Sequence, residues 1–455
     1  MAIKQPNIVV IYPDQMRADV MSCAGNPCIK TPNLDGLASQ GVRFSNAYTS
    51  FPLCSPFRAS FMTGKYAHSA GMCANHYPIP LNQEFLADIL RCNGYRTGYF
   101  GKWHLNGGPK HSPVRREERL GFDTFRGFSR GHRYFNSIYY KDDNPQPFTS
   151  RRYEPDYQTN HIIEFMLKSS DSPFFAMICY GIPHPPLDAP PEFLNLYSPK
   201  DVPVADNTPQ DAEFRLKARE FIAKYYGLVA CVDSNVGRIL DWLNRNNLSE
   251  NTLVIFVSDH GEMAGEHGLY DKKTYYRSSM QVPLIVRYPA RFKGGRIVSH
   301  LIDPSVDTMP TLLEICGIPF PKDVQGTSYL SLLDGSDKPV RNAIHYEICM
   351  EKEGPEKFPV PERGIRTLDW LYVRTEEKPV ALFNLHNDPL EMNNLVHSIA
   401  HKNIMIKLDA EVAKHMKRTN DRWDIQAVFP PPDFQSHEDG AKYAEELSRK
   451  AILEQ

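Results

Sequence analysis

The sequence predicts an α/β fold with a large, mainly parallel β-sheet, followed by a smaller α+β subdomain. Short apolar runs rich in β-branched and aromatic residues are typical of buried strands, and helical patterns separate these runs. At 455 residues the chain is too long for one small core. We therefore expect a large domain over residues 1–340 and a subdomain over residues 341–455.

Each predicted element follows from a local pattern. The helix over 33–40 begins after Thr31 and Pro32, an N-cap and a first-turn proline, and Gly41 ends it. The other patterns are apolar runs for strands and apolar stripes for helices. Strands of the large sheet are expected at 8–12, 95–100, 174–179, 253–257 and 284–287, and further helices at 85–92 and 214–246.

The alternation of strands and helices weakens after about residue 335. Short antiparallel strands are expected at 343–348, 370–374 and 380–383, and a helix at 390–418. Three prolines, at positions 430–432, then separate a last charged helix over 440–454.

Composition restricts the class of protein. Hydrophobic residues make up 41% and charged residues 23%, as in ordinary globular proteins. With 52 Lys and Arg against 54 Asp and Glu, a net charge of -2 gives no global attraction for nucleic acid or an anionic membrane. Nine cysteines, an odd number scattered through a large chain, do not indicate a disulfide scaffold. No signal peptide precedes the first strand, which favours the cytoplasm, or the periplasm or secretion if a leader has been trimmed.

Chemically active residues follow the predicted strands. Ligands of open α/β sheets bind at the carboxyl ends of strands, so side chains in these positions are expected to meet at one rim. Taken alone, each has a more ordinary interpretation, such as a turn-capping Asp or a solvated Lys. The residues are Asp14, Lys102, His104, His184, Asp259 and His260.

The segment 54–64, CSPFRASFMTG, is the decisive motif. Pro56 near the first turn predicts that Cys54 begins a helix, where free N–H groups and the helix dipole favour an anion. The segment resembles the signature of the type I sulfatases, in which Cys54, Pro56, Arg58 and Gly64 would have fixed places. That resemblance implies an alkaline-phosphatase-like fold, and oxidation of Cys54 to formylglycine by a maturation enzyme.

The same resemblance implies one divalent cation. Its ligands would be Asp14, Gln15, the residue made from Cys54, Asp259 and His260, with Gln15 standing where the family commonly has a second acid. Oxygen-rich ligands favour Ca²⁺, or Mg²⁺, over zinc. A cation would also lower the pKa of the hydroxyl nucleophile and attract the anionic ester.

Other motifs of the family would bind sulfate and move protons. Lys102 and His104, in GKWHL, resemble one of them. His184 and Lys272 stand in the expected order, with Lys273 as a rival of Lys272. By the resemblance, Arg58 and the lysines neutralise sulfate oxygens, His184 or Lys272 is the general acid, and His104 is the base.

The resemblance extends to the segment 382–395, LFNLHNDPLEMNNL, a closing motif of structural character. We therefore expect a sulfatase that acts on a sulfated carbohydrate such as a glycosaminoglycan-derived saccharide, with no prediction of oligomeric state. The loop 130–135, RGHRYF, either lines the substrate rim or is an ordinary loop.

Two other functions remain open. The alternative enzyme is a phosphonate monoester or phosphodiester hydrolase of the same superfamily, against which the pair Lys102 and His104 argues. A binding protein that had lost its chemistry would have no reason to keep the whole set.

Overall fold

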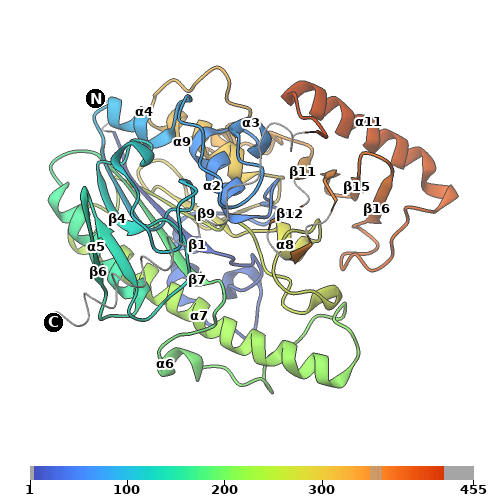
Figure 1. The fold of residues 1–455 in the computed structure, drawn as a ribbon, viewed down its shortest axis with the longest axis horizontal. Helices are drawn as coiled ribbons and strands as arrows, with labels where there is room; N and C mark the ends of the chain where they lie inside the picture. Colours follow the sequence, from blue (N-terminus) through green and yellow to red (C-terminus); the bar gives the residue numbers. More distant parts are fainter. Residues whose placement is uncertain (1–4, 350–351, 354–355, 358–359, 425–455) are drawn as a thin grey trace.

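The computed structural model describes residues 5–349, 352–353, 356–357 and 360–424. The described chain forms a ten-stranded sheet, a four-stranded sheet and a two-stranded hairpin (Figure 1). This arrangement confirms the predicted α/β class with a smaller C-terminal subdomain.

The large sheet has the order β10-β2-β9-β8-β1-β7-β3-β4-β5-β6. Its central strands β8, β1, β7, β3 and β4 are parallel neighbours, whereas β9, β5 and β6 run antiparallel to their neighbours. The bounds are β1 Asn7–Asp14, β2 Val42–Phe44, β3 Arg96–Lys102, β4 Thr124–Phe128, β5 Ile138–Lys141, β6 Asn144–Thr149, β7 Phe174–Pro183, β8 Thr252–Val257, β9 Leu284–Arg287 and β10 Arg296–Val298.

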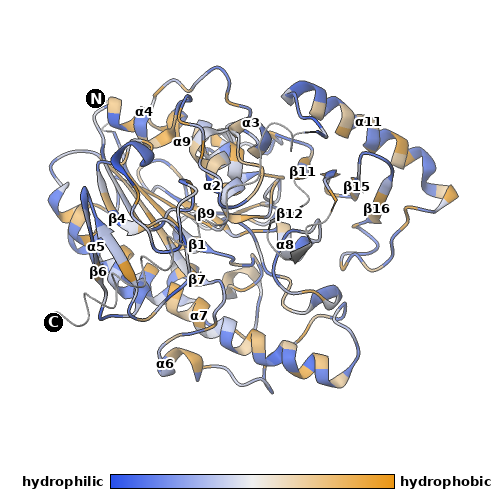
Figure 2. Ribbon diagram, viewed as in Figure 1, coloured by the Kyte–Doolittle hydropathy of each residue, from blue (hydrophilic) through white to orange (hydrophobic). Residues whose placement is uncertain are grey.

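Helices cover both faces of this sheet, so every residue of β1, β7 and β8 is buried. In β1, Ile8, Val10 and Tyr12 pack in one core cluster while Val9 and Ile11 pack in the other. This alternation follows from the two-residue period of a strand. Figure 2 shows hydrophobic and hydrophilic residues in turn along the ribbon of the long helix α7, Ala212–Arg245.

The helices divide between these two faces. The first face packs against α2 Cys54–Thr63, α4 Leu86–Cys92 and α9 Pro304–Ile315. The second packs against α1 Pro32–Gln40, α5 Glu154–Lys168 and α7 Ala212–Arg245. Short helices are α3 Ala67–Ala70, α6 Pro191–Leu194, α8 Arg277–Met280 and α10 Leu330–Leu333.

The smaller sheet has the order β11-β14-β15-β16, with all neighbours antiparallel. One face, including Tyr346 and Phe383, packs into the core of the large domain. The opposite face, including Tyr372, packs against α11. The bounds are β11 Ile344–Ile348, β14 Glu362–Arg366, β15 Trp370–Arg374, β16 Pro379–Asn384 and α11 Lys402–Thr419, and the hairpin pairs β12 Lys352–Glu353 with β13 Glu356–Lys357.

The prediction of a helix over 390–418 is wrong over residues 390–398, because only a 3-10 helix over Ile399–His401 precedes α11, which begins at Lys402. The segment before it is held against β16 instead. The amide oxygen of Asn394 accepts a hydrogen bond from the Leu382 N–H (3.0 Å), and the Leu395 N–H donates to the Leu382 carbonyl (2.7 Å). In an α-helix the Leu395 N–H would donate to the carbonyl four residues earlier, so its bond to Leu382 excludes a helix at this point. The expected proline break at 430–432 and helix at 440–454 lie outside the described residues.

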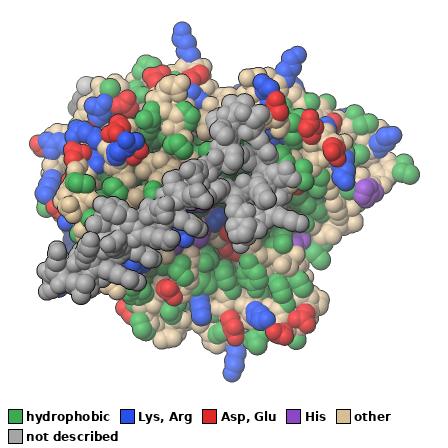
Figure 3. Space-filling model, viewed as in Figure 1, with side chains coloured by type: hydrophobic (Ala, Val, Ile, Leu, Met, Phe, Trp, Pro, Cys, Tyr) green, Lys and Arg blue, Asp and Glu red, His purple; other side chains and the backbone are tan. Residues whose placement is uncertain are grey.

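In the described part of the chain, no helix is both long enough and apolar enough to cross a membrane. Basic and acidic side chains are interspersed around the face shown in Figure 3. That distribution agrees with the small net charge of -2.

Candidate active site

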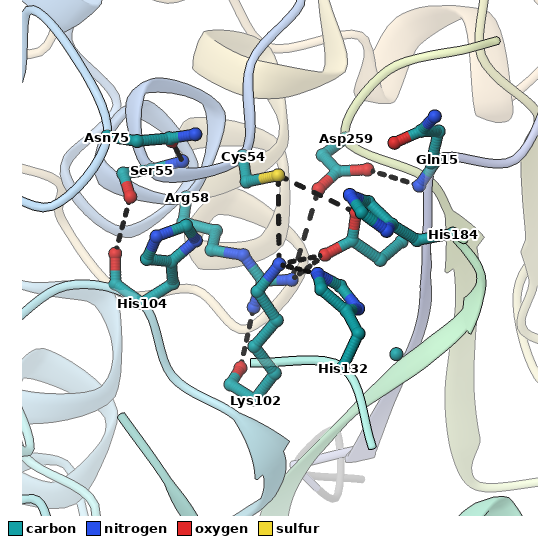
Figure 4. A network of polar contacts seen from close by, with 12 residues as sticks. Gln15, Cys54, Ser55, Arg58, Asn75, Lys102, His104, His132, His184 and Asp259 are labelled. Carbon is teal, nitrogen blue, oxygen red and sulfur yellow. Dashed lines mark hydrogen bonds and ion pairs between the residues drawn. The ribbon is translucent and has the colours of Figure 1, made fainter. Parts of the chain in front are cut away.

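The predicted site residues meet at the carboxyl ends of neighbouring parallel strands. Asp14 ends β1 and Lys102 ends β3, while His184 directly follows β7 and Asp259 comes two residues after β8. Because β8, β1, β7 and β3 are consecutive in the sheet, these ends share one edge. Figure 4 shows the side chains converging there on Cys54.

Cys54 is the first residue of α2, as Pro56 in the first turn predicted. Its side chain is buried, and its Sγ lies 3.3 Å from His260 Nε2, 3.6 Å from Asp14 Oδ1 and 3.7 Å from Lys102 Nζ. Burial raises the pKa of the Cys54 thiol to about 11. A neutral buried thiol is a weak nucleophile at neutral pH, so the encoded side chain does not by itself explain catalysis.

The start of α2 is held in place by two hydrogen bonds from Ser55. Its N–H donates to Asn75 Oδ1 (2.9 Å), and its hydroxyl donates to the His104 carbonyl (2.7 Å). The N–H of Ser55 is therefore not free to bind an anion. The predicted anion site at the start of this helix has one backbone donor fewer than expected. The bonds also fix Cys54 relative to the loop after β3.

Four buried side chains could hold a cation. The ligand atoms of Asp14, Cys54, Asp259 and His260 all lie within 4.8 Å of one another. Asp259 Oδ2 is buried and makes no hydrogen bond, which is costly unless another positive group binds there. His260 Nδ1 donates to the Gly261 carbonyl (3.0 Å), so the lone pair of Nε2 faces the cluster. These residues fit a divalent cation.

Gln15 lies beside this cluster, and its side-chain amide is engaged by other residues. Its Oε1 accepts a hydrogen bond from Lys272 Nζ (2.5 Å), and its Nε2 donates to Glu262. The backbone N–H of Gln15 donates to Asp259 Oδ1 (2.9 Å). Gln15 thus links the two loops that carry the acids, and its role as a ligand stays a prediction.

Cations surround the carboxylate of Asp14. Lys102 Nζ lies 2.7 Å and an Arg58 terminal nitrogen 3.3 Å from Asp14 Oδ2. Burial alone would raise the pKa of Asp14, but the charges of Lys102 and Arg58 hold it well below its usual range. Asp14 is therefore ionised at neutral pH.

Arg58 is buried on α2 and held from three sides. It donates to the Lys102 carbonyl (2.7 Å) and to the Tyr99 hydroxyl (3.1 Å), and its guanidinium lies over the Tyr12 ring, 4.6 Å from the centroid. Its Nε is buried without a hydrogen-bond partner. A rigid cation is thus presented beside residue 54, as anion binding requires.

Lys272 belongs to the site. Its Nζ donates to His184 Nε2 (3.0 Å) and lies 3.0 Å from Asp271. Burial alone would lower the pKa of Lys272, but neighbouring groups, chiefly Cys54 and Asp271, raise it above its usual value. Among the two lysines left open by the sequence, the structure places Lys272 against the predicted residue His184.

His104 has a left-handed backbone, with φ of 59°. Its Nε2 lies 3.0 Å from His76 Nδ1, whereas its Nδ1 is buried with no hydrogen-bond partner. Burial lowers the pKa of His104 well below its usual value, and Lys102 and His76 lower it further. A neutral imidazole is the form that a general base requires.

Sequence reasoning missed two contributions to the site, His76 and His132. His76 contacts His104, and His132 Nε2 lies 3.0 Å from Lys102 Nζ. The sequence had marked the loop 130–135 only as a possible substrate rim. The strand that precedes this loop, β4 Thr124–Phe128, was not predicted because Arg126 and Gly127 interrupt its apolar run. Recognising β4 as a further parallel strand would have placed His132 at the same edge of the sheet.

Comparison with known proteins identifies the family. The sulfatase family profile matches residues 6–318, and that of the C-terminal region of N-sulphoglucosamine sulphohydrolase matches residues 265–418. The chain is 32% identical over 432 residues to an ulvan-active sulfatase of Formosa agariphila, covering 93% of this chain and 84% of that protein.

Solved structures agree. The structure of the YidJ sulfatase from Bacteroides fragilis superposes with a TM-score of 0.86 at 28% identity, covering 93% of this chain and 98% of the other. A structure solved in complex with its substrate D-glucosamine-2-N,6-O-disulfate gives a TM-score of 0.79 at 25% identity, covering 92% of this chain and 99% of the other.

Membership of this family implies a divalent metal and a formylglycine, and the buried cluster around Cys54 offers a place for both. The chain belongs to the sulfatase family and is a sulfuric ester hydrolase with an alkaline-phosphatase-like fold.

Proposed function

We propose that this sulfatase removes sulfate from a carbohydrate, with a formylglycine made from Cys54 by a maturation enzyme and with Ca²⁺ as its cation. The observation that carries the proposal is the position of Cys54, whose Sγ lies within 3.7 Å of an acid, a histidine and a lysine at the start of a helix. A hydrated formylglycine supplies one hydroxyl that attacks sulfur and a second that later expels sulfate.

The cation would be held by Asp14, Asp259 and His260, together with the modified residue 54. Hard carboxylate oxygens, including Asp259 Oδ2, which accepts no hydrogen bond, favour Ca²⁺ over a soft metal. The cation supplies Lewis acidity, which lowers the pKa of a hydroxyl at residue 54. Gln15 would join this set through the second lone pair of Oε1, which already accepts a hydrogen bond from Lys272.

Positive side chains bind the sulfate group. Arg58 and Lys102 flank residue 54, and Lys272 contacts His184. A sulfate monoester carries a single negative charge, which these cations match without any global positive charge of the protein. Their burial strengthens each hydrogen bond, because water does not compete for it.

Proton transfers divide between two sides of the site. His184 and Lys272 form a hydrogen-bonded pair (3.0 Å) suited to protonating the leaving alcohol. His104, neutral and with Nδ1 unpaired, is suited to removing the proton from the second hydroxyl of residue 54.

A carbohydrate substrate is supported by the similarity to the ulvan-active sulfatase and to the structure solved with a disulfated glucosamine. A screen of purified, converted protein against defined sulfated disaccharides tests this proposal. Release of sulfate from at least one saccharide is expected. Turnover confined to aryl sulfates would contradict it.

The rival function, hydrolysis of phosphonate monoesters or phosphodiesters, is tested by matched aryl substrates. The pair Lys102 and His104 favours the sulfate. We expect kcat/KM for an aryl sulfate to exceed that for the aryl phosphonate, and the reverse order would favour the rival.

A further inference from the structure

His132, in the loop 130–135, occupies the active site although the resemblance to the family gives it no role. It follows β4, the parallel neighbour of β3, so its loop reaches the same edge of the sheet as Lys102. The side chain is half-buried, with one ring nitrogen on Lys102 and the other on Tyr134. Figure 4 shows it beside Lys102 and below His184.

The hydrogen bonds assign the protons of this imidazole. A lysine ammonium can only donate, so His132 Nε2 accepts from Lys102 Nζ (3.0 Å) and carries no proton. The proton is therefore on Nδ1, which faces the Tyr134 hydroxyl oxygen at 3.2 Å. That hydroxyl lies 2.8 Å from the Gly181 carbonyl and 2.5 Å from the His184 carbonyl, and it donates to this pair. The chain of donors thus runs from Lys102 through His132 to Tyr134 and ends on the backbone around β7.

A second imidazole is stacked on the first. The rings of His132 and His184 have centroids 3.6 Å apart and planes inclined by 4°. His184 repeats the pattern, because its Nε2 accepts from Lys272 Nζ (3.0 Å) and its Nδ1 donates to the Pro185 carbonyl (2.5 Å). Lys102 and Lys272 are therefore each held by one member of a neutral, parallel pair of rings.

The contact with His132 Nε2 determines where the ammonium group of Lys102 points. Its ammonium group has three donors, directed at Asp14 Oδ2 (2.7 Å), His132 Nε2 (3.0 Å) and Cys54 Sγ (3.7 Å). Without the acceptor on His132, the ammonium would be free to turn towards the carboxylate of Asp14. The cation would then be displaced from the face of residue 54 where the sulfate must bind.

We propose that His132 is a positioning residue of the sulfatase reaction, which holds Lys102 towards the sulfate through Nε2. This inference rests on the proposed function of the site. A displacement of about 1 Å in a catalytic group lowers rates by up to about 100-fold.

Two substitutions separate the contacts of the two nitrogens. His132→Gln places an amide oxygen near the position of Nε2 and keeps the acceptor for Lys102. His132→Asn places an amide nitrogen near the position of Nδ1 and keeps only the donor to Tyr134. His132→Ala removes both contacts, and all three variants remove the stacked ring.

We expect His132→Ala and His132→Asn to lower kcat/KM for an aryl sulfate by about 10- to 100-fold, and His132→Gln to recover most of that loss. The affinity for inorganic sulfate, measured by calorimetry in calcium buffer, should be weakened by His132→Ala and His132→Asn and largely kept by His132→Gln. This measurement does not depend on turnover. Thermal unfolding midpoints of all three variants should stay close to that of the unsubstituted protein.

Recovery by Asn instead of Gln would overturn the proposal, because the contact with Tyr134 would then be the one that matters. Unchanged sulfate affinity and unchanged kcat/KM in all three variants would also overturn it. Failure of the proposed function has a different signature, in which the unsubstituted, fully converted protein hydrolyses no sulfate ester at all.

Discussion

Replacing Lys102 by Met should destabilise the protein mainly when no cation is bound. Lys102 is about 1% exposed, and its Nζ lies 2.7 Å from the fully buried carboxylate of Asp14. Removing one partner of a buried ion pair costs about 3–5 kcal/mol, because the other charge is left without compensation. Arg58, at 3.3 Å from the same carboxylate oxygen, remains, so the lower figure applies.

A bound cation changes this result. Ca²⁺ at the cluster of Asp14 and Asp259 would compensate the same carboxylate, and we expect the loss to fall to ~1 kcal/mol. The difference of ~2 kcal/mol must also appear in binding, so Lys102→Met should bind Ca²⁺ about 30-fold more tightly than the unsubstituted protein.

The assay is urea unfolding of both proteins in chelator and in excess calcium, with calorimetry for the calcium affinity. Lys102→Arg keeps the charge and should lose less stability than Lys102→Met. Lys217→Met is the matched control, since Lys217 pairs with Glu213 on the exposed face of α7 and should leave the unfolding midpoint unchanged. An equal loss of stability with and without calcium, or a weaker calcium affinity, would refute the reasoning.

Three further predictions address the metal, the proton transfers and pH. Asp259→Asn keeps the size of the side chain and should weaken calcium affinity at least tenfold by calorimetry, and chelation should abolish turnover; stoichiometric zinc in elemental analysis would contradict the assignment. His104→Ala should trap a sulfated enzyme, seen as a burst of about one equivalent of phenol and a mass gain of about 80 Da. His184→Ala should lose more activity on sugar sulfates than on activated aryl sulfates. Equal losses on both substrates without an adduct would show that the histidines only bind sulfate. Burial raises the pKa of Glu154 to about 8, so the folded protein keeps a proton that the unfolded chain releases near pH ~4.3. The free energy of unfolding should therefore fall as the pH rises from about 4 to about 8, by up to ~3 kcal/mol at pH 7. Glu154→Gln has no such proton to lose, so its unfolding midpoint should fall less than that of the unsubstituted protein between pH 5.5 and 8; parallel curves would show that Glu154 is ionised in the fold.

The strands β1, β3, β7 and β8 and the start of α2 could be predicted because their signals are local. Apolar runs buried on both faces have no other common structure, and Pro56 marks the first turn of the helix that Cys54 begins. The direction of β9 was not predictable, since an apolar run is the same in a parallel and an antiparallel position. It runs antiparallel to β8 and β2 within the mainly parallel sheet.

Other elements depend on partners that are distant in the sequence. The strand β14 contains the buried Arg363 and Arg366, and no apolar pattern marks it. Arg363 is paired with Asp421 and Arg366 with Glu391, so charges far along the chain make these buried positions possible. The role of His132 likewise depends on Lys102 and His184, which only the folded sheet brings to it.

The central claim is that sulfate ester hydrolysis depends on a formylglycine at residue 54. The most direct measurement is the turnover of an aryl sulfate by preparations with different degrees of conversion, each quantified by peptide mass spectrometry as a loss of about 18 Da at Cys54. We predict a rate proportional to the converted fraction, with no activity when conversion is zero. Full turnover by protein whose Cys54 is unmodified would contradict the claim.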